Sequence, residues 1–446
     1  MTHYGVTQIH PLALLATLGA GVFMLSSRRS QAILPFILVT CMIPVAQRVV
    51  VASLDFDMIR ILILFGWARL LARNELHPPR LNEIDIAFVT WVTVSAVIYV
   101  ILYATTQALV YRLGLLFDAF GVYFLLRMLL RHPGDTVRAA RYLAYCAAFV
   151  ATAMAIEWAT GRNLFSVFGG VPAVTWVRDG RLRCQGAFSH PIMAGSFGAT
   201  LVPVFVGMWF AFPHWRRLAA VGAASGSLIA VAAASSGAFL SLVGGIGAFA
   251  LWPLRRNTRA LRWATVLCLT VLHFAREKPV WHLIARASDL LGGEGYHRYR
   301  LFDAFVNRWG EWWLLGTKST AHWGPGLTDT TNQYVAEGVS GGILTLAAFV
   351  VLLALAFRGI GRAAQAGRRL GRPPLARGLW CWGLGAALTA HAVAFISVSY
   401  FGQMQIVLYL LLALISAELS FAMGSRRSQR QAQVMPVPAL PAVQAG

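Results

Sequence analysis

The chain has 446 residues, of which 58% are hydrophobic and only 12% are charged. Soluble domains carry about 25% charged residues, so this composition excludes an ordinary soluble fold and predicts an all-α polytopic membrane protein. The formal net charge is +21, but basic residues gathered in cytoplasmic loops account for such a charge, and no nucleic-acid-binding motif is present. We therefore expect no nucleic-acid partner.

Apolar runs close to the ~20 residues of a membrane span recur along the whole chain. They begin near Pro11, Gln31, Met58, Ile84, Ala108, Tyr142, Pro191, Leu218, Ala238, Leu261, Gly338, Gly378 and Gln403. The sequence predicts about 12–13 transmembrane helices. We divide it into N-terminal helices (1–160), a core with two long loops (161–358), C-terminal helices (359–424) and a disordered cytoplasmic tail (425–446).

The distribution of basic residues predicts the orientation of these helices. If the N-terminus lies outside, every cytoplasmic connection is basic, from "SSRRS" at 26–30 to "GSRRSQR" at 424–430. Most of the opposite connections are short and carry little charge, as the positive-inside rule requires.

Two outer connections, 161–189 and 276–337, break this rule. They carry Arg162, Arg178, Arg181, Arg183, Arg276, Lys278, Arg286, Arg298, Arg300, Arg308 and Lys318. Because orientation does not require this charge, binding of an anionic ligand is one possible role for it. Solvated loop charge, paired with acidic residues of the same loops, is the alternative.

Arg112 and Asp118 lie within one predicted span. Ionisable residues in a span indicate a functional site by default. A structural ion pair between the two is the alternative.

The sequence indicates no metal site and no disulfide framework. The five cysteines are odd in number and have no ligand spacing, and no cluster of His, Cys and carboxylate residues has the spacing of a zinc site. We expect neither a metal nor a cofactor.

Four segments together resemble the superfamily of O-antigen ligases and Wzy-type polysaccharide polymerases. They are "RCQGAFSHP" at 183–191, "AAASSGAFLSLVGGIGAF" at 232–249, "HRYRLFDAF" at 297–305 and "GPGLTDTTNQYVAEGVSGG" at 324–342. They match, in order, the patterns R-x-x-G-x-F followed by (H/N)-P, S-x-G-A, R-x-x-L-W-x-x-A, and G-x-G…H-N-x-Y-L…E-x-G-x-x-G. Phe302 replaces the Trp of the third pattern, and Thr331 replaces the His of the fourth.

The resemblance implies an inverting, metal-independent glycosyltransferase of the bacterial inner membrane. Its fold would be a helical bundle of about a dozen spans with a large periplasmic loop that contains short helices. Its donor would be an undecaprenyl-diphosphate-linked glycan, with no nucleotide sugar and no cofactor. The active site would face the periplasm. A chain-length regulator would be a further partner of a polymerase.

By position in these motifs, Arg183 and Arg298 would bind the leaving diphosphate. Since Thr331 cannot act as a base near neutral pH, Asp329 and His322 are the candidates for the base that activates the acceptor. The alternative role for Asp329 is to cap a short helix. The alternative for His322 is an ordinary loop histidine that forms a hydrogen bond with the backbone.

Further candidates for glycan contacts are His190, Arg181, Arg300, Asn332 and Tyr334. For His190, Asn332 and Tyr334 simple packing is the alternative.

Between the two reactions of the superfamily, the D-x-x-N-x-Y arrangement favours a polymerase of exopolysaccharide or O-antigen repeat units. A ligase that transfers the glycan to the lipid A core of lipopolysaccharide, or to another acceptor, is the close alternative. A lipid or polysaccharide transporter is a more distant one, because transporters are often built from paired halves with charged or broken helices at the midplane.

Overall fold

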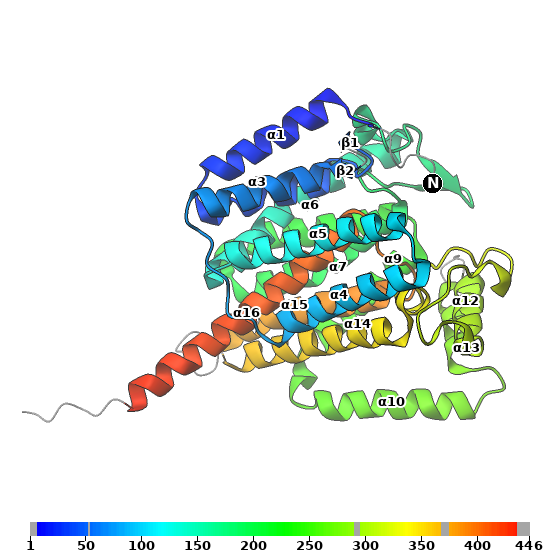
Figure 1. Cartoon of the computed structure of the whole chain (residues 1–446). Helices are drawn as coiled ribbons and strands as arrows, with labels where there is room; N and C mark the ends of the chain where they lie inside the picture. Colours follow the sequence, from blue (N-terminus) through cyan, green and yellow to red (C-terminus); the bar gives the residue numbers. More distant parts are fainter. Residues whose placement is uncertain (1–6, 52–53, 290–294, 367–373, 435–446) are drawn as a thin grey trace, which may run out of the picture.

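The chain folds into a bundle of roughly parallel helices (Figure 1). The structure is a computed structural model that describes residues 7–51, 54–289, 295–366 and 374–434. Within these ranges six helices are long and apolar enough to cross a membrane, which confirms an all-α, multi-pass membrane protein. They are α4 (Glu83–Tyr103), α5 (Thr106–Leu129), α6 (Pro133–Thr160), α7 (Pro191–Ala211), α14 (Gln333–Ala366) and α16 (Gln403–Val434), the last over Gln403–Gly424.

Each of the other predicted apolar runs also coincides with a helix. These are α1 (Pro11–Ser26), α2 (Ile33–Met42), α3 (Met58–Ala72), α8 (Arg216–Ala232), α9 (Ser236–Ala250), α10 (Thr258–Phe274) and α15 (Pro374–Ala394). All but α15 are shorter than the ~20 residues of a typical membrane span.

Local signals in the sequence set several helix starts. Asn82 and Asp85 form a capping box at the start of α4, and the side chain of Thr105 caps α5. Proline opens both α6 and α7. Proline lacks the backbone N–H, and this costs nothing in the first turn of a helix because an N–H there has no intrahelical partner.

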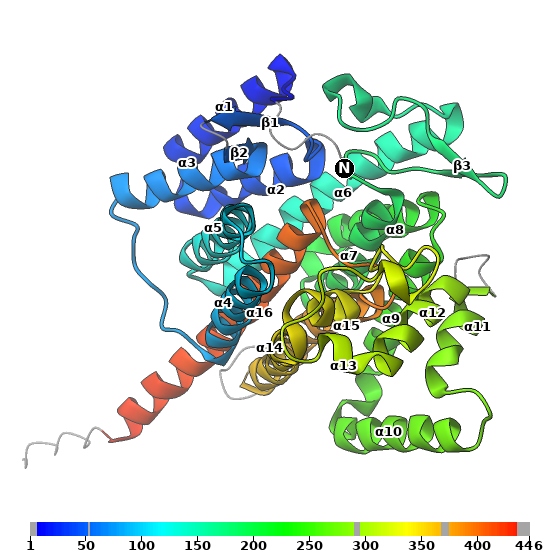
Figure 2. The ribbon, with the colours of Figure 1, turned by 45° about the vertical axis from the view of Figure 1, so that its right-hand side comes forward.

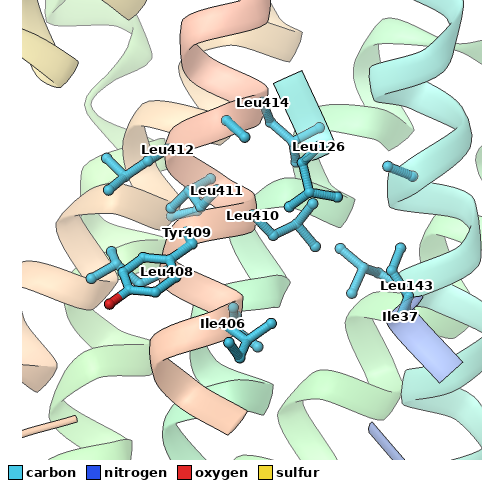
Figure 3. Close-up of a cluster of buried hydrophobic side chains, with 14 of the residues drawn as sticks. Ile37, Leu126, Leu143, Ile406, Leu408, Tyr409, Leu410, Leu411, Leu412 and Leu414 are labelled. Carbon is cyan, nitrogen blue, oxygen red and sulfur yellow. The ribbon is translucent and has the colours of Figure 1, made fainter. Parts of the chain in front are cut away.

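The core of the bundle lies around α16. Its side chains Leu410 and Leu414 lie near Ile37 of α2, Leu126 of α5 and Leu143 of α6 (Figure 3). α7 is still more enclosed, because 89% of its apolar segment is buried inside the protein. These two helices occupy the interior, and the others present apolar faces outward, where lipid would cover them.

α10 lies alongside the bundle and apart from it in both views (Figures 1 and 2). None of its residues is buried.

Among the described residues, ion pairs join several helices of the bundle, and two of them involve α5. Asp85 pairs with Arg127 at 2.9 Å, and Asp118 accepts two bonds of 2.7 Å from the guanidinium of Arg60. Arg112 and Asp118 therefore do not form the structural ion pair that the sequence analysis gave as an alternative. Arg60, on α3, lies 58 residues from Asp118 in the chain, and no local spacing pointed to it.

α14 is broken near its start, at Gly341 and Gly342. Gly342 has a φ of +66°, and a Cβ there would lie 2.3 Å from the carbonyl oxygen of Leu314. The loop enters this break: Ile343 N donates to Trp313 O at 2.8 Å, and Thr317 N donates to Val339 O at 2.8 Å. The second long loop is thus anchored in the first turns of a membrane helix.

The connections contain short elements. The hairpins β1 (Arg48–Val51) with β2 (Leu54–Asp57) and β3 (Trp176–Arg178) with β4 (Arg181–Arg183) are antiparallel. The long connection between α10 and α14 contains the predicted short helices: η5 (Val280–His282), α11 (Leu283–Asp289), α12 (Gly295–Asn307), α13 (Trp309–Trp312) and η6 (Ala321–Trp323).

Three predicted boundaries differ from the observed ones. α14 begins at Gln333, so the second loop ends before the predicted 337, and α14 continues through the boundary placed at 358. α16 continues to Val434, so the first part of the tail predicted to be disordered (425–446) is helical. Residues 435–446 lie outside the described part of the chain.

The predicted orientation can be tested with single cysteines at the two ends of the bundle. Val177 and Leu76 are both exposed, in the first long loop and in the α3–α4 connection. In a Cys268→Ala background, a membrane-impermeant thiol reagent should label Val177→Cys in intact cells and Leu76→Cys only after permeabilisation. The reverse pattern would overturn the orientation.

Candidate functional site

Both long loops lie at one end of the bundle. The β3–β4 hairpin of the first loop and the helices α12 and α13 of the second project from the end opposite to the last turns of α16 (Figures 1 and 2). Two segments more than 100 residues apart in the sequence therefore share one surface. The arginines that break the positive-inside pattern are carried by these two segments.

The first loop is held by Glu157, a buried carboxylate in the last turn of α6. One oxygen accepts the Gly186 N–H at 2.9 Å, and the other accepts the Gln185 N–H and the Thr175 hydroxyl, each at 3.1 Å. The Gly186 carbonyl accepts the side-chain amide of Asn163 at 2.8 Å. Gly186 has a φ of +57°, which is the reason that this motif position suits glycine.

The two loops meet at the turn between α8 and α9. Cys184, next to Arg183, donates its N–H to Ala232 O at 3.0 Å. Arg298, buried on α12, donates from Nη1 to the hydroxyl of Ser236 at 3.2 Å. Since Ala232 ends α8 and Ser236 begins α9, the residue next to Arg183 and the side chain of Arg298 both bond to the ends of one short turn.

This turn is also conformationally unusual and closely packed. Ala234 has a φ of +43°, a left-handed conformation that costs a non-glycine residue about 1 kcal/mol or more. Burial raises the pKa of the neighbouring Cys184 thiol to about 12, so this cysteine is an inert part of the packing.

The second loop has a small hydrophobic core of its own. Leu301 and Phe305 of α12 pack there with Trp312, Leu327 and Val335. Arg298 lies on the same helix as Leu301 and Phe305. Arg300 lies against the turn at 324–327: a Cβ on Gly324 would be 2.6 Å from Nη2 of Arg300.

His322 is bound to a side chain, and not to backbone as the sequence had suggested as an alternative. Its Nε2 lies 2.6 Å from Glu311 Oε2, which also accepts the Trp323 indole N–H at 2.8 Å. Arg308 binds the other oxygen at 3.1 Å. The bonds from Trp323 and His322 lower the pKa of Glu311 below its usual range, which favours a carboxylate that orients the imidazole ring.

Asp329 is exposed on the stretch that leads into α14. Among the described residues its carboxylate makes no hydrogen bond or ion pair. It does not cap α14: Asn332 does, since its Oδ1 accepts the Val335 N–H at 3.2 Å. The helix-cap alternative for Asp329 therefore does not hold for α14, and its role as a base stays a prediction.

The residues after Asp329 hold the connection between α15 and α16. Asn332 donates its amide to Ile396 O at 3.2 Å, and the Tyr334 hydroxyl donates to Ala392 O at 3.1 Å. Gln333 Oε1 accepts the Tyr400 N–H at 2.7 Å. The packing roles considered for Asn332 and Tyr334 are thus present, and their contact with a glycan stays a prediction.

The remaining candidates lie in the first loop. His190 caps α7, with Nδ1 accepting the Ile192 N–H at 3.2 Å. Arg181 is exposed at the start of β4, opposite Arg178 of β3. Arg178 forms an exposed pair with Asp179 at 3.6 Å. Within the described residues, no group of three His, Cys, Asp or Glu side chains could hold a metal ion.

Sequence reasoning missed two carboxylates of this site, Glu157 and Glu311. Glu157 lies in an apolar run that ends at a loop, and one acidic residue in the last turn of a span was a usable signal. Glu311 had no signal, because its partner His322 lies 11 residues away across an irregular loop.

No protein-family model matches the chain, and no curated protein matches it.

The importance of Glu157 can be measured through Cys184. Glu157→Ala would leave two buried backbone N–H groups without an acceptor, at a cost of about 3 kcal/mol. In a Cys268→Ala background, we expect thiol labelling of Cys184 to become about 100-fold faster, as local opening becomes easier. The exposed Glu277 gives a matched control, and Glu277→Ala should leave the rate unchanged. An unchanged rate in Glu157→Ala would show that the carboxylate does not hold this loop.

Proposed function

We propose that this protein is a glycan transferase of the bacterial inner membrane that polymerises undecaprenyl-diphosphate-linked repeat units on the periplasmic face. The observation that supports it most strongly is that Cys184, next to Arg183, and Arg298 both bond to the α8–α9 turn. Three of the four segments that resemble the superfamily (183–191, 232–249 and 297–305) come together there.

The arginines suit the leaving group of this reaction. A guanidinium binds phosphate oxygens with two parallel charge-assisted bonds. Negative charge on the diphosphate grows as the glycosidic bond breaks. Fixed cations at that position therefore stabilise the transition state more than the ground state.

The transfer is a single displacement with inversion. A hydroxyl oxygen of the acceptor sugar attacks the anomeric carbon of the donor, and the bond from that carbon to the diphosphate oxygen breaks. Undecaprenyl diphosphate leaves with the bonding electrons. The hydroxyl proton passes to the carboxylate of Asp329, the role that a carboxylate base has in inverting glycosidases.

A ligase would use the same donor site with a different acceptor. The pairing of His322 with Glu311 is the observation that favours a histidine base, as in the H-N motif of the superfamily.

The arginines are tested by substitutions that keep the charge. Lysine loses the planar two-pronged geometry of arginine, so Arg183→Lys and Arg298→Lys should each lower transfer about 100-fold. The assay follows chain extension by purified protein with a synthetic undecaprenyl-diphosphate oligosaccharide. Arg178→Lys, in the same loop and paired with Asp179, should retain full activity. Normal products from both Arg183→Lys and Arg298→Lys would remove the main support for this function.

The base is tested in the same assay. Asp329→Asn removes the proton acceptor and should abolish transfer, while binding of undecaprenyl diphosphate stays normal. His322→Ala should be milder, with a loss of about tenfold or less. If the two variants show the opposite order, His322 is the base and Asp329 is an ordinary loop carboxylate.

A further inference from the structure

A cavity of about 300 Å³ opens among α4, α5, α14 and α16. It lies at the loop-bearing end of the bundle, because its walls come from the last turns of α4, the first turns of α5, α14 and α16, and the α15–α16 connection. Its lining includes Trp91, Tyr99, Arg112, Thr330, Glu337 and Tyr400. The volume is at the lower end of the ~300–1,000 Å³ range of small-molecule sites.

Arg112 brings a positive charge into this cavity from a membrane-spanning helix. Its Nη1 donates to the Ser95 hydroxyl at 3.2 Å, and its guanidinium lies 3.8 Å from the centre of the Tyr99 ring. Its Nε is buried without a hydrogen-bond partner among the described residues. Asp118, the nearest acid along its own helix, is bound to Arg60.

An arginine in a span without a paired carboxylate is costly and marks a ligand site. In the described part of the chain, no carboxylate lies within ion-pair distance of Arg112. An anionic group that enters from the outer end would compensate this charge and accept from the buried Nε–H.

The other walls favour an anion that is part of a sugar. The carboxylate of Glu337 is held in place by the Trp91 indole N–H at 3.0 Å and by the Gln333 amide at 2.7 Å. A fixed carboxylate accepts hydrogen bonds from sugar hydroxyls. The side chains of Trp91 and Tyr99 also line the cavity and add apolar surface to its walls.

We propose that this cavity binds a sugar residue that carries a carboxylate, so that the glycan handled by the protein contains an acidic sugar. The proposal rests on the proposed glycan transfer and names its substrate class. Arg112 binds the sugar carboxylate, Glu337 accepts a hydroxyl, and the aromatic rings cover the ring face. Thr330 lines the cavity next to Asp329, which places the bound sugar beside the segment that carries the proposed base.

The α15–α16 connection separates this cavity from the arginines of the α8–α9 turn. Tyr400 lines the cavity, whereas Ser397 packs against α9, where a Cβ on Gly237 would lie 2.5 Å from the Ser397 Cβ. The arrangement suits two neighbouring subsites, one for the diphosphate and one for an acidic sugar of the chain.

Binding is measured by saturation-transfer NMR on the purified full-length protein in detergent. The probes are methyl glucuronide, the neutral methyl glucoside and inorganic phosphate. We expect methyl glucuronide to bind wild type at least about tenfold more tightly than methyl glucoside, because the carboxylate adds a charge-assisted bond. Inorganic phosphate and anionic phospholipid should not displace it. Displacement by either would show a general anion or lipid headgroup site and overturn the sugar assignment.

Variants identify the residue responsible. Arg112→Gln should weaken methyl glucuronide binding about tenfold or more and leave methyl glucoside unchanged. Arg112→Lys keeps a charge in the span, so it should fold and show an intermediate loss. Arg178→Gln is the matched control, and thermal unfolding in detergent checks the fold of each variant. If the Arg112→Gln and Arg112→Lys variants fold and bind methyl glucuronide as tightly as wild type, the proposal is overturned.

The same variants separate this proposal from the proposed function. Arg183→Lys should bind methyl glucuronide normally and fail in transfer. Binding without any transfer by wild type would leave the cavity assigned and contradict the function. Transfer by wild type without binding of methyl glucuronide would support the proposed function and overturn the assignment of the cavity.

Discussion

The buried carboxylate of Glu157 is the contact on which the loop-bearing end of the bundle depends. It accepts the N–H groups of Gln185 and Gly186 and so fixes the segment just after Arg183. That segment reaches the end of α8 through Cys184, and the start of α9 binds Arg298. A carboxylate in an apolar helix is costly unless it is fully hydrogen-bonded, and here three hydrogen bonds from the first loop offset that cost.

The second long loop is held by different contacts. It enters the break in α14 and supplies acceptors and donors to the freed backbone groups at 339 and 343. Irregular backbone at this depth is tolerated only where protein partners satisfy it. The small core of α12 and α13 then keeps Arg298 and Arg300 in place without support from a larger domain. The described parts of both loops are thus held by fixed hydrogen bonds and packing, as a site that must stabilise charge without rearranging requires.

The sequence predicted the helices well because an apolar run of span length is compatible with little besides a membrane helix. It also indicated the two long loops, because their charge departs from the pattern of the other connections, and the side of the membrane on which they lie stays a prediction. It failed where partners are distant in the chain. Arg60 and Asp118 pair across helices, and Glu311 binds His322 across an irregular loop. None of these contacts leaves a pattern along one segment. The cavity around Arg112 was equally hidden, because its walls come from four helices that only folding brings together.

The central claim is that the outer end recognises a lipid-linked diphosphate through Arg183 and Arg298. Native mass spectrometry of the purified protein with equal amounts of undecaprenyl diphosphate and undecaprenyl monophosphate tests it most directly. The account predicts that wild type retains the diphosphate at least about tenfold more than the monophosphate, and that the Arg183→Lys/Arg298→Lys double variant loses this preference. Equal retention of the two lipids by wild type, or an unchanged preference in the double variant, would contradict it.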